Sequence, residues 1–257
     1  MTVALVHDVV SGPPNADIVL FLGSLGSDRS MWSAQVTGIS DMATVITADV
    51  RGHGGTAVGD GPVTVHDLSE DVIALLDALA IDRVHLVGLS LGGAIAQTIA
   101  AHHPERVHTL TVLCSAAKFG DPTNWTSRAE TVRRDGLASI AQSIVGRWFT
   151  TDYAADHPNV VARAVDMVSA VNDEGYARCC EALASYDSRP FLDRIVAPTL
   201  VIAGDCDLAT PREVMAVIAD GVTNARMHVL SPAAHLAATE RAEEVTTLIR
   251  DHVGRPE

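Results

Sequence analysis

Short runs of apolar residues alternate with stretches of helical periodicity along most of the chain. An unbroken apolar run predicts a strand buried on both faces, and apolar positions three and four residues apart predict a helix. The predicted strands are residues 17–22, 44–50, 84–87, 107–113, 198–203 and 226–230, and the predicted helices are residues 63–80, 94–100 and 240–253. This alternation predicts an α/β fold with a mostly parallel central sheet and helices on both of its faces.

Residues 121–190 interrupt the alternation. They are helical in period and rich in charged and aromatic side chains, and strands resume only at Pro198. We expect this segment to form a helical cap over the carboxyl-terminal edge of the sheet, where open α/β sheets bind their ligands. The expected organisation is a core formed by residues 1–120 and 191–257, with a cap formed by residues 121–190.

The segment Gly88–Gly92, with the sequence Gly-Leu-Ser-Leu-Gly, joins a predicted strand to a predicted helix. A serine on such a turn has a strained backbone that exposes its hydroxyl above the sheet, and the flanking glycines lack Cβ atoms that would clash. The helix N-terminus also favours developing negative charge. The pattern therefore predicts Ser90 as a nucleophile, with a simple helix N-cap as the alternative.

A nucleophilic serine needs a base, and the base needs an anionic partner that orients it. On a strand-turn-helix framework the chain order is Ser, then Asp or Glu, then His. Asp205 and Asp207 follow the predicted strand 198–203, and His235 follows the strand 226–230. We assign His235 as the base and Asp207 as its partner, with Asp205 as the alternative acid.

Backbone N–H groups are the expected ligands of the oxyanion that forms during acyl transfer. One is the N–H of Leu91, the residue after the nucleophile, and the other is the Leu25 N–H in the loop after the first predicted strand. A second glycine-rich loop, residues 51–55, contains His53. Its expected role is structural, in shaping the edge of the sheet.

The composition narrows the range of partners and compartments. A formal net charge of −14 argues against a nucleic-acid partner, and a hydrophobic fraction of 47% is ample for a sizeable core. No window is long and apolar enough to span a membrane, and no signal-peptide pattern is visible. Four cysteines without zinc or disulfide spacing are expected to be free thiols in a reducing cytosol, which predicts a cytoplasmic protein.

Together these motifs resemble the α/β-hydrolase superfamily over essentially the whole chain, and the cap and oxyanion-loop segments are similar to the 3-oxoadipate enol-lactonase family. In that family the usual His-Gly of the oxyanion loop is varied, as it is at Gly23-Ser24 here. The segments that carry the closer resemblance are Ser24–Asp28 with Met31-Trp32, Cys114–Lys118, Trp125, Arg133, Gly136-Leu137 and Gly146–Thr150.

The resemblance implies a cytosolic serine hydrolase that opens 3-oxoadipate enol-lactone to 3-oxoadipate in the β-ketoadipate pathway of aromatic catabolism, with no metal or other cofactor. A small anionic lactone would need cations in so acidic a protein, and arginine pairs well with a carboxylate. The expected substrate-binding residues are Trp125, Arg133 and Trp148, with Lys118, Arg134 and Arg147 as further available cations.

Other functions fit the same triad. A general carboxylesterase or a cofactor-free perhydrolase would accept neutral esters, and a C–C bond hydrolase would attack a ketone. A ligand receptor that retains the triad would bind tightly and turn over slowly. The sequence does not indicate the oligomeric state.

Overall fold

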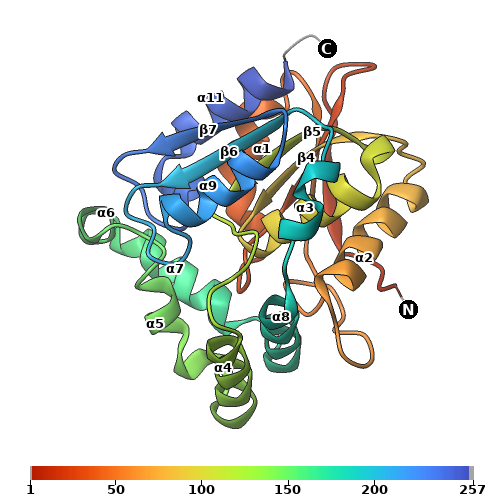
Figure 1. Ribbon diagram of the computed structural model, residues 1–257. Helices are drawn as coiled ribbons and strands as arrows, with labels where there is room; N and C mark the ends of the chain where they lie inside the picture. Colours follow the sequence, from red (N-terminus) through yellow and green to blue (C-terminus); the bar gives the residue numbers. More distant parts are fainter. Residues whose placement is uncertain (1, 255–257) are drawn as a thin grey trace.

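A seven-stranded sheet organises the protein, which a computed structural model describes from residue 2 to residue 254 (Figure 1). The strand order is β1-β3-β2-β4-β5-β6-β7, and only β1 runs antiparallel to its neighbour. The strands are β1 (His7–Val10), β2 (Ile18–Leu22), β3 (Thr44–Ala48), β4 (Val84–Leu89), β5 (Val107–Leu113), β6 (Thr199–Gly204) and β7 (Ala225–Leu230). The predicted mostly parallel sheet is confirmed. The sequence pattern does not predict β1, because its four residues are too few and too exposed to form an apolar run.

Helices cover both faces of the sheet, as the alternation predicts. On one face α1 (Ser33–Ile39) packs against α11 (Ala242–Val253). On the other lie α2 (Val65–Ala78), α3 (Leu91–His102) and α9 (Arg212–Gly221). None of the helices in residues 2–254 is long and apolar enough to cross a membrane.

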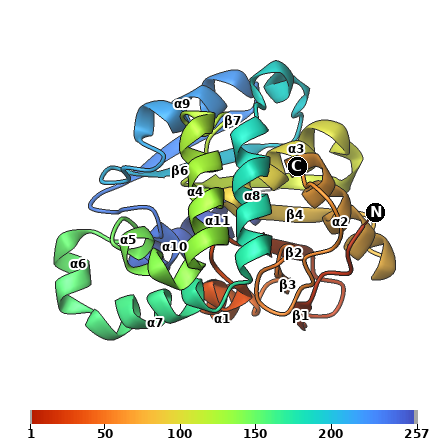
Figure 2. The same ribbon diagram turned by 90° about the horizontal axis from the view of Figure 1, so that it is seen from below.

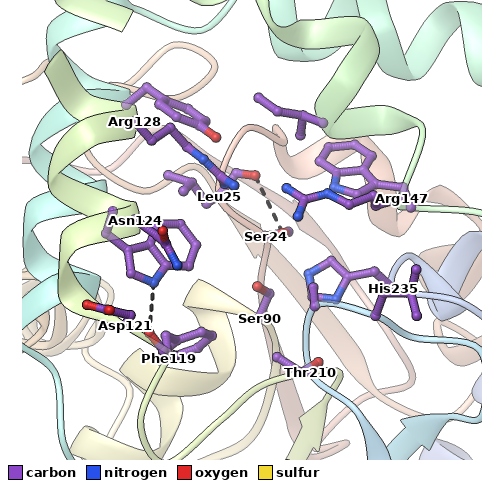
Figure 3. Close-up of a pocket in the computed structure, with 17 residues that line it drawn as sticks. Ser24, Leu25, Ser90, Phe119, Asp121, Asn124, Arg128, Arg147, Thr210 and His235 are labelled. Atoms are coloured by element: carbon purple, nitrogen blue, oxygen red, sulfur yellow. Dashed lines mark hydrogen bonds between the residues drawn. The ribbon is translucent and has the colours of Figure 1, made fainter. Parts of the chain in front are cut away.

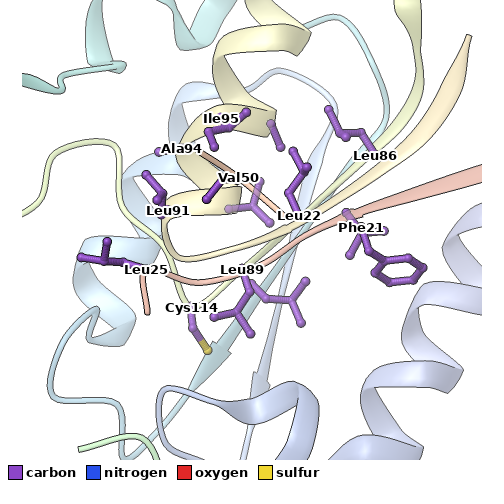
Figure 4. Close-up of a cluster of buried hydrophobic side chains, with 14 of the residues drawn as sticks. Phe21, Leu22, Leu25, Val50, Leu86, Leu89, Leu91, Ala94, Ile95 and Cys114 are labelled. Carbon is purple, nitrogen blue, oxygen red and sulfur yellow. The ribbon is translucent and has the colours of Figure 1, made fainter. Parts of the chain in front are cut away.

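The hydrophobic core extends through the sheet, its covering helices and the cap, and Figure 4 shows a part of it around β2, β4 and α3. Helix α3 is buried along almost its whole length, because neighbouring helices and the sheet surround it. Burying one large aliphatic side chain contributes about 1.5–3 kcal/mol, so this cluster strongly stabilises the packing of α3 on β2 and β4. Side chains from β2, β4 and α3 in this cluster include Phe21, Leu22, Leu86, Leu89, Leu91, Ala94 and Ile95.

Five helices lie between β5 and β6 and cover the carboxyl-terminal edge of the sheet (Figure 2). Helices α4 and α8 pack side by side over this edge, and α7 packs against α5 and α6. The bounds are α4 (Pro122–Asp135), α5 (Ala141–Val145), α6 (Thr151–Asp156), α7 (Pro158–Ser169) and α8 (Asp173–Ser185). The division of the chain at residues 120 and 190 stays a prediction, and we call α4–α8 the cap. The remaining short elements are η1 (Arg29–Trp32), η2 (Pro104–Arg106), η3 (Leu137–Ser139), η4 (Arg189–Arg194) and α10 (Ala237–Glu240).

Two glycines bring the cap and the core into backbone contact. A Cβ added to Gly175, in the first turn of α8, would lie 2.5 Å from the Cα of Gly52 in the loop after β3. The N–H of Asn172, the N-cap of α8, donates to the Gly52 carbonyl at 3.2 Å. The start of α8 is therefore fixed against the glycine-rich loop that contains His53.

Replacing Gly175 by Ala should destabilise the protein by about 1–3 kcal/mol, because the added methyl group meets the Gly52 backbone. Intrinsic helix preference alone predicts the opposite, a stabilisation of about 1 kcal/mol. The sign of the change in a urea unfolding curve separates the two effects. A variant more stable than the wild type would contradict the close backbone contact.

Candidate active site

The loops that carry the predicted chemistry meet at one edge of the sheet. Leu25 follows β2, Ser90 follows β4, Asp207 follows β6 and His235 follows β7. These strands are parallel, so their carboxyl ends lie at the same edge. Leu25, Ser90 and His235 line a single pocket there (Figure 3).

Ser90 occupies a strained turn between β4 and α3. Its backbone lies at φ 56° and ψ −112°, in a region that residues other than glycine rarely adopt. A Cβ on Gly88 would lie 2.2 Å from the Gly92 carbonyl oxygen, and a Cβ on Gly92 would lie 2.2 Å from the Leu22 carbonyl oxygen. The Ser90 N–H donates to the Leu113 carbonyl at 3.0 Å. The two glycines are therefore required for the turn that presents the Ser90 hydroxyl to the pocket.

His235 and Asp207 form a buried pair. His235 Nδ1 lies 2.8 Å from Asp207 Oδ2, which also accepts the Thr210 hydroxyl at 2.7 Å. The other carboxylate oxygen accepts the N–H groups of Ala209 at 2.8 Å and Thr210 at 3.1 Å. Burial acts to raise the pKa of Asp207, but the charge of His235 and the hydrogen bonds from His235 and Thr210 outweigh it and hold that pKa well below its usual range. The ionised Asp207 thus orients the imidazole, whose Nε2 remains for Ser90 (Figure 3).

The alternative acid, Asp205, has a different set of partners. It is exposed, and its carboxylate accepts hydrogen bonds from the Ser231 hydroxyl and from the Ala233 N–H. The hydrogen bond from Ser231 lowers the pKa of Asp205. Asp205 therefore fixes the loop that leads to His235, and Asp207 is the carboxylate that contacts the imidazole.

Leu25 and Leu91 place two backbone N–H groups beside the nucleophile. The Ser24 carbonyl accepts the Ser27 N–H at 3.0 Å and the Ser27 hydroxyl at 2.8 Å. The carbonyl and N–H of a trans peptide point in opposite directions, so the Leu25 N–H points away from Ser27. Leu91 is the first residue of α3, where N–H groups have no acceptor within the helix. Neither N–H has a hydrogen-bond acceptor in the described part of the chain, which leaves both available for an oxyanion.

The pocket above Ser90 has a volume of about 450 Å³ and is walled by both core and cap (Figure 3). Trp125 from α4 and Trp148 from the segment after α5 both line it. The Trp125 indole N–H donates to the Phe119 carbonyl at 2.8 Å, which fixes the ring against the pocket wall. The structure thus places two of the three predicted cap residues at the site.

The third predicted cap residue, Arg133, lies elsewhere. It does not line the pocket and instead binds Glu174 and Glu181 of α8 through its guanidinium group. These contacts raise the pKa of Arg133 and lower the pKa of Glu174 to about 2, chiefly through the Arg133 hydrogen bond. Arg133 links the two long cap helices, and the expectation that it binds substrate is not supported by its position.

Two other arginines face the pocket. The guanidinium carbon of Arg128 lies 4.8 Å from the Trp125 ring centre, and Arg147 is exposed in the pocket wall. Neither forms an ion pair with a carboxylate of residues 2–254. Partial burial and the charge of Arg128 lower the pKa of Arg147. The fully buried hydroxyl of Tyr176 also lines the pocket and has no hydrogen-bond partner within the same residues.

Sequence reasoning missed Arg128 and Tyr176, and named Arg147 only among the available cations. Arg128 and Arg133 flank opposite sides of the apolar face of α4 formed by Ala129 and Val132. Helical periodicity therefore does not distinguish them. The feature that distinguishes Arg133 from Arg128 lies on α8. Two glutamates seven residues apart on one face of that helix form ion pairs with Arg133.

Comparison with known proteins agrees with this geometry. The family model described as the alpha/beta hydrolase fold matches residues 17–242. 3-Oxoadipate enol-lactonase 2 of Acinetobacter baylyi is 39% identical over 232 residues, which cover 90% of this chain and 86% of the relative. The chain belongs to the 3-oxoadipate enol-lactonase family.

Solved structures place this family member among similar hydrolases. The enol-lactonase from Burkholderia xenovorans LB400 superposes with a TM-score of 0.95 at 36% identity, over 98% of this chain and 96% of that one. A thermophilic esterase from Thermogutta terrifontis, with malate bound, superposes with a TM-score of 0.91 at 29% identity, over 97% and 92% of the two chains. The protein is thus a hydrolase of the α/β fold. Within residues 2–254 no three His, Cys, Asp or Glu side chains group to hold a metal ion, and independence from cofactors stays a prediction.

Replacing Asp207 by Asn should lower kcat by about 10³–10⁴-fold, because the amide no longer holds the imidazole in the productive tautomer or stabilises its cation. Asp205→Asn is the matched control and should keep kcat within a few-fold, since Asp205 only fixes a loop. Steady-state assays of both variants on p-nitrophenyl acetate measure the contrast. Equal losses in the two variants would reject the assignment of Asp207.

Proposed function

We propose that this hydrolase opens 3-oxoadipate enol-lactone to 3-oxoadipate in the cytoplasm, without a metal or other cofactor. The names of two similar relatives, the 3-oxoadipate enol-lactonases 1 and 2 of Acinetobacter baylyi, support this substrate. The observation that carries the proposal is the pair Arg128 and Arg147, which face the nucleophile's pocket without a carboxylate partner in residues 2–254. The lactone carries a carboxylate, and arginine binds a carboxylate through two parallel hydrogen bonds.

Acylation begins when the Ser90 Oγ attacks the lactone carbonyl carbon. The proton passes to His235 Nε2, because the Nδ1 side of the ring is held by Asp207. The new oxyanion accepts hydrogen bonds from the Leu25 and Leu91 N–H groups. Removing one such donor lowers kcat by about 10²–10³-fold in enzymes of this type, so these N–H groups supply a large share of the rate enhancement.

Collapse of the tetrahedral intermediate breaks the ring C–O bond and leaves the chain attached to Ser90 as an ester. His235 returns its proton to the departing enol oxygen, and the enol becomes a ketone. The ketone is a poor nucleophile, so the ring does not close again. His235 then takes a proton from water, which attacks the ester, and gives that proton to the Ser90 Oγ as 3-oxoadipate is released.

The cap residues select for the negative charge of the substrate. The chain has a formal net charge of −14, which repels an anion at long range. Arg128 and Arg147 provide a local positive potential directly above Ser90 (Figure 3). The Tyr176 hydroxyl adds a further hydrogen-bond donor beside them, because burial raises its pKa and keeps it protonated.

The purified protein should hydrolyse 3-oxoadipate enol-lactone with a far higher kcat/KM than p-nitrophenyl acetate. The loss of enol-lactone absorbance measures the first reaction. Ser90→Ala should lower both rates by several orders of magnitude, because the triad acts as a unit. Rapid cleavage of the neutral ester with no turnover of the lactone would reject the proposed substrate and favour a general carboxylesterase.

Replacing Arg128 or Arg147 by Gln should lower kcat/KM for the lactone by about tenfold to a hundredfold, the range expected for one lost hydrogen bond to a charged group. The rate on neutral p-nitrophenyl acetate should change by less than threefold. Arg133→Gln is the matched control on α4 and should leave the KM for the lactone unchanged. Equal effects on the charged and neutral substrates would contradict a carboxylate site at these arginines.

A further inference from the structure

His53 is a fully buried histidine that the proposed reaction does not use. It lies in the glycine-rich loop after β3 and does not line the pocket. Burial lowers its pKa, so the ring is neutral at physiological pH. A neutral imidazole in a buried position needs partners for both of its nitrogens.

Both partners of His53 are backbone groups with a fixed direction. His53 Nδ1 lies 2.9 Å from the Arg51 carbonyl oxygen, and Nε2 lies 3.0 Å from the Gly26 nitrogen. A carbonyl only accepts and a backbone N–H only donates, so Nδ1 carries the proton and Nε2 accepts from Gly26. One tautomer of His53 therefore bridges the loop after β3 and the loop after β2.

The Gly26 N–H belongs to the peptide that follows Leu25. Gly26 has a φ of 88°, a left-handed conformation that favours glycine. The preceding peptide is fixed by Ser27, which donates twice to the Ser24 carbonyl. The hydrogen bond to His53 fixes the second peptide, so the direction of the Leu25 N–H is set from both sides.

The cap encloses this arrangement. The Tyr176 ring centre lies 6.5 Å from that of His53, and a Cβ on Gly26 would lie 3.3 Å from the Tyr176 ring. Gly52, next to His53, meets the backbone of Gly175 in α8. Water is therefore excluded from the His53–Gly26 hydrogen bond, and no other acceptor of residues 2–254 is bonded to the Gly26 N–H.

We propose that His53 is a positioning residue for the oxyanion hole: by accepting the Gly26 N–H, it aims the Leu25 N–H at the reacting carbonyl oxygen. The proposal rests on the proposed triad mechanism, in which Leu25 supplies one of the two oxyanion donors. It assigns His53 no contact with the substrate. Losing the acceptor should lower the rate of the chemical step and leave substrate binding intact.

Two conservative variants separate the two hydrogen bonds of His53. The amide nitrogen of His53→Asn takes the place of Nδ1 and keeps the bond to Arg51, but the shorter side chain does not reach Gly26. The amide oxygen of His53→Gln takes the place of Nε2 and accepts the Gly26 N–H. His66→Asn, on an exposed position of α2, is the matched control.

His53→Asn should lower kcat by about tenfold to a hundredfold with little change in KM, as expected for a small misplacement of a catalytic group. His53→Gln should retain kcat within about threefold of the wild type. The rate at which diethyl p-nitrophenyl phosphate inactivates Ser90 should fall in parallel with kcat, because its phosphoryl oxygen occupies the same hole. Where His53→Asn is unstable, His53→Leu fills most of the buried space without an acceptor and should show the same kcat loss.

Assays on p-nitrophenyl acetate keep this test independent of the natural substrate, since failure on the lactone alone would count against the proposed substrate only. A thermal melt of each variant accompanies the kinetics. The proposal is overturned if the folded variants without an acceptor keep wild-type kcat, or if His53→Gln loses as much kcat as His53→Asn at an unchanged KM. A lower melting temperature with unchanged kcat and inactivation rate would assign His53 a structural role only.

Discussion

The strained backbone of Ser90 is the constraint on which the rest of the site depends. A residue in this conformation costs of the order of 1–3 kcal/mol, and the surrounding structure must supply that energy. The N–H of Ser90 is bound to the end of β5, and the N–H of Gly92 donates to the Gly23 carbonyl at the end of β2. The contact between Gly92 and Leu22 leaves no room for a side chain. The turn therefore fixes β2, β4, β5 and α3 to one another, so the nucleophile and the oxyanion loop after β2 occupy one rigid frame.

The arginines of the cap form two groups that differ in whether a carboxylate neutralises their charge. The glutamates of α8 neutralise Arg133 on the outer surface, where an ion pair contributes little to stability. No carboxylate of residues 2–254 neutralises Arg128 or Arg147 in the pocket, although the chain carries an excess of acidic groups. Two uncompensated cations that face each other destabilise the free protein slightly, and a bound anion relieves that repulsion. The two arginines thus supply at the site the attraction for an anion that the acidic surroundings oppose.

The sequence predicts those parts of the fold and site that depend on local pattern. Short runs rich in apolar residues identify six strands, and the spacing of glycines around Ser90 identifies the turn, because each signal is contained in a few adjacent residues. The short exposed strand β1 carries no such signal. The choice between Asp205 and Asp207 depends on which carboxylate meets His235, and the choice between Arg128 and Arg133 depends on how α8 packs against α4. Both are long-range contacts that periodicity does not encode.

The cap and the oxyanion hole are physically coupled through the start of α8. Tyr176 presents its hydroxyl to the substrate pocket, and its ring packs over His53 and Gly26. Gly175, directly before it, contacts the loop that holds His53. A change of side chain at Tyr176 that alters substrate choice therefore also disturbs the loop that stabilises the transition state. Helix α4 and the segment around Arg147 line the same pocket. The first turn of α8 is thus under two constraints at once, one from the substrate pocket and one from the loop that holds His53.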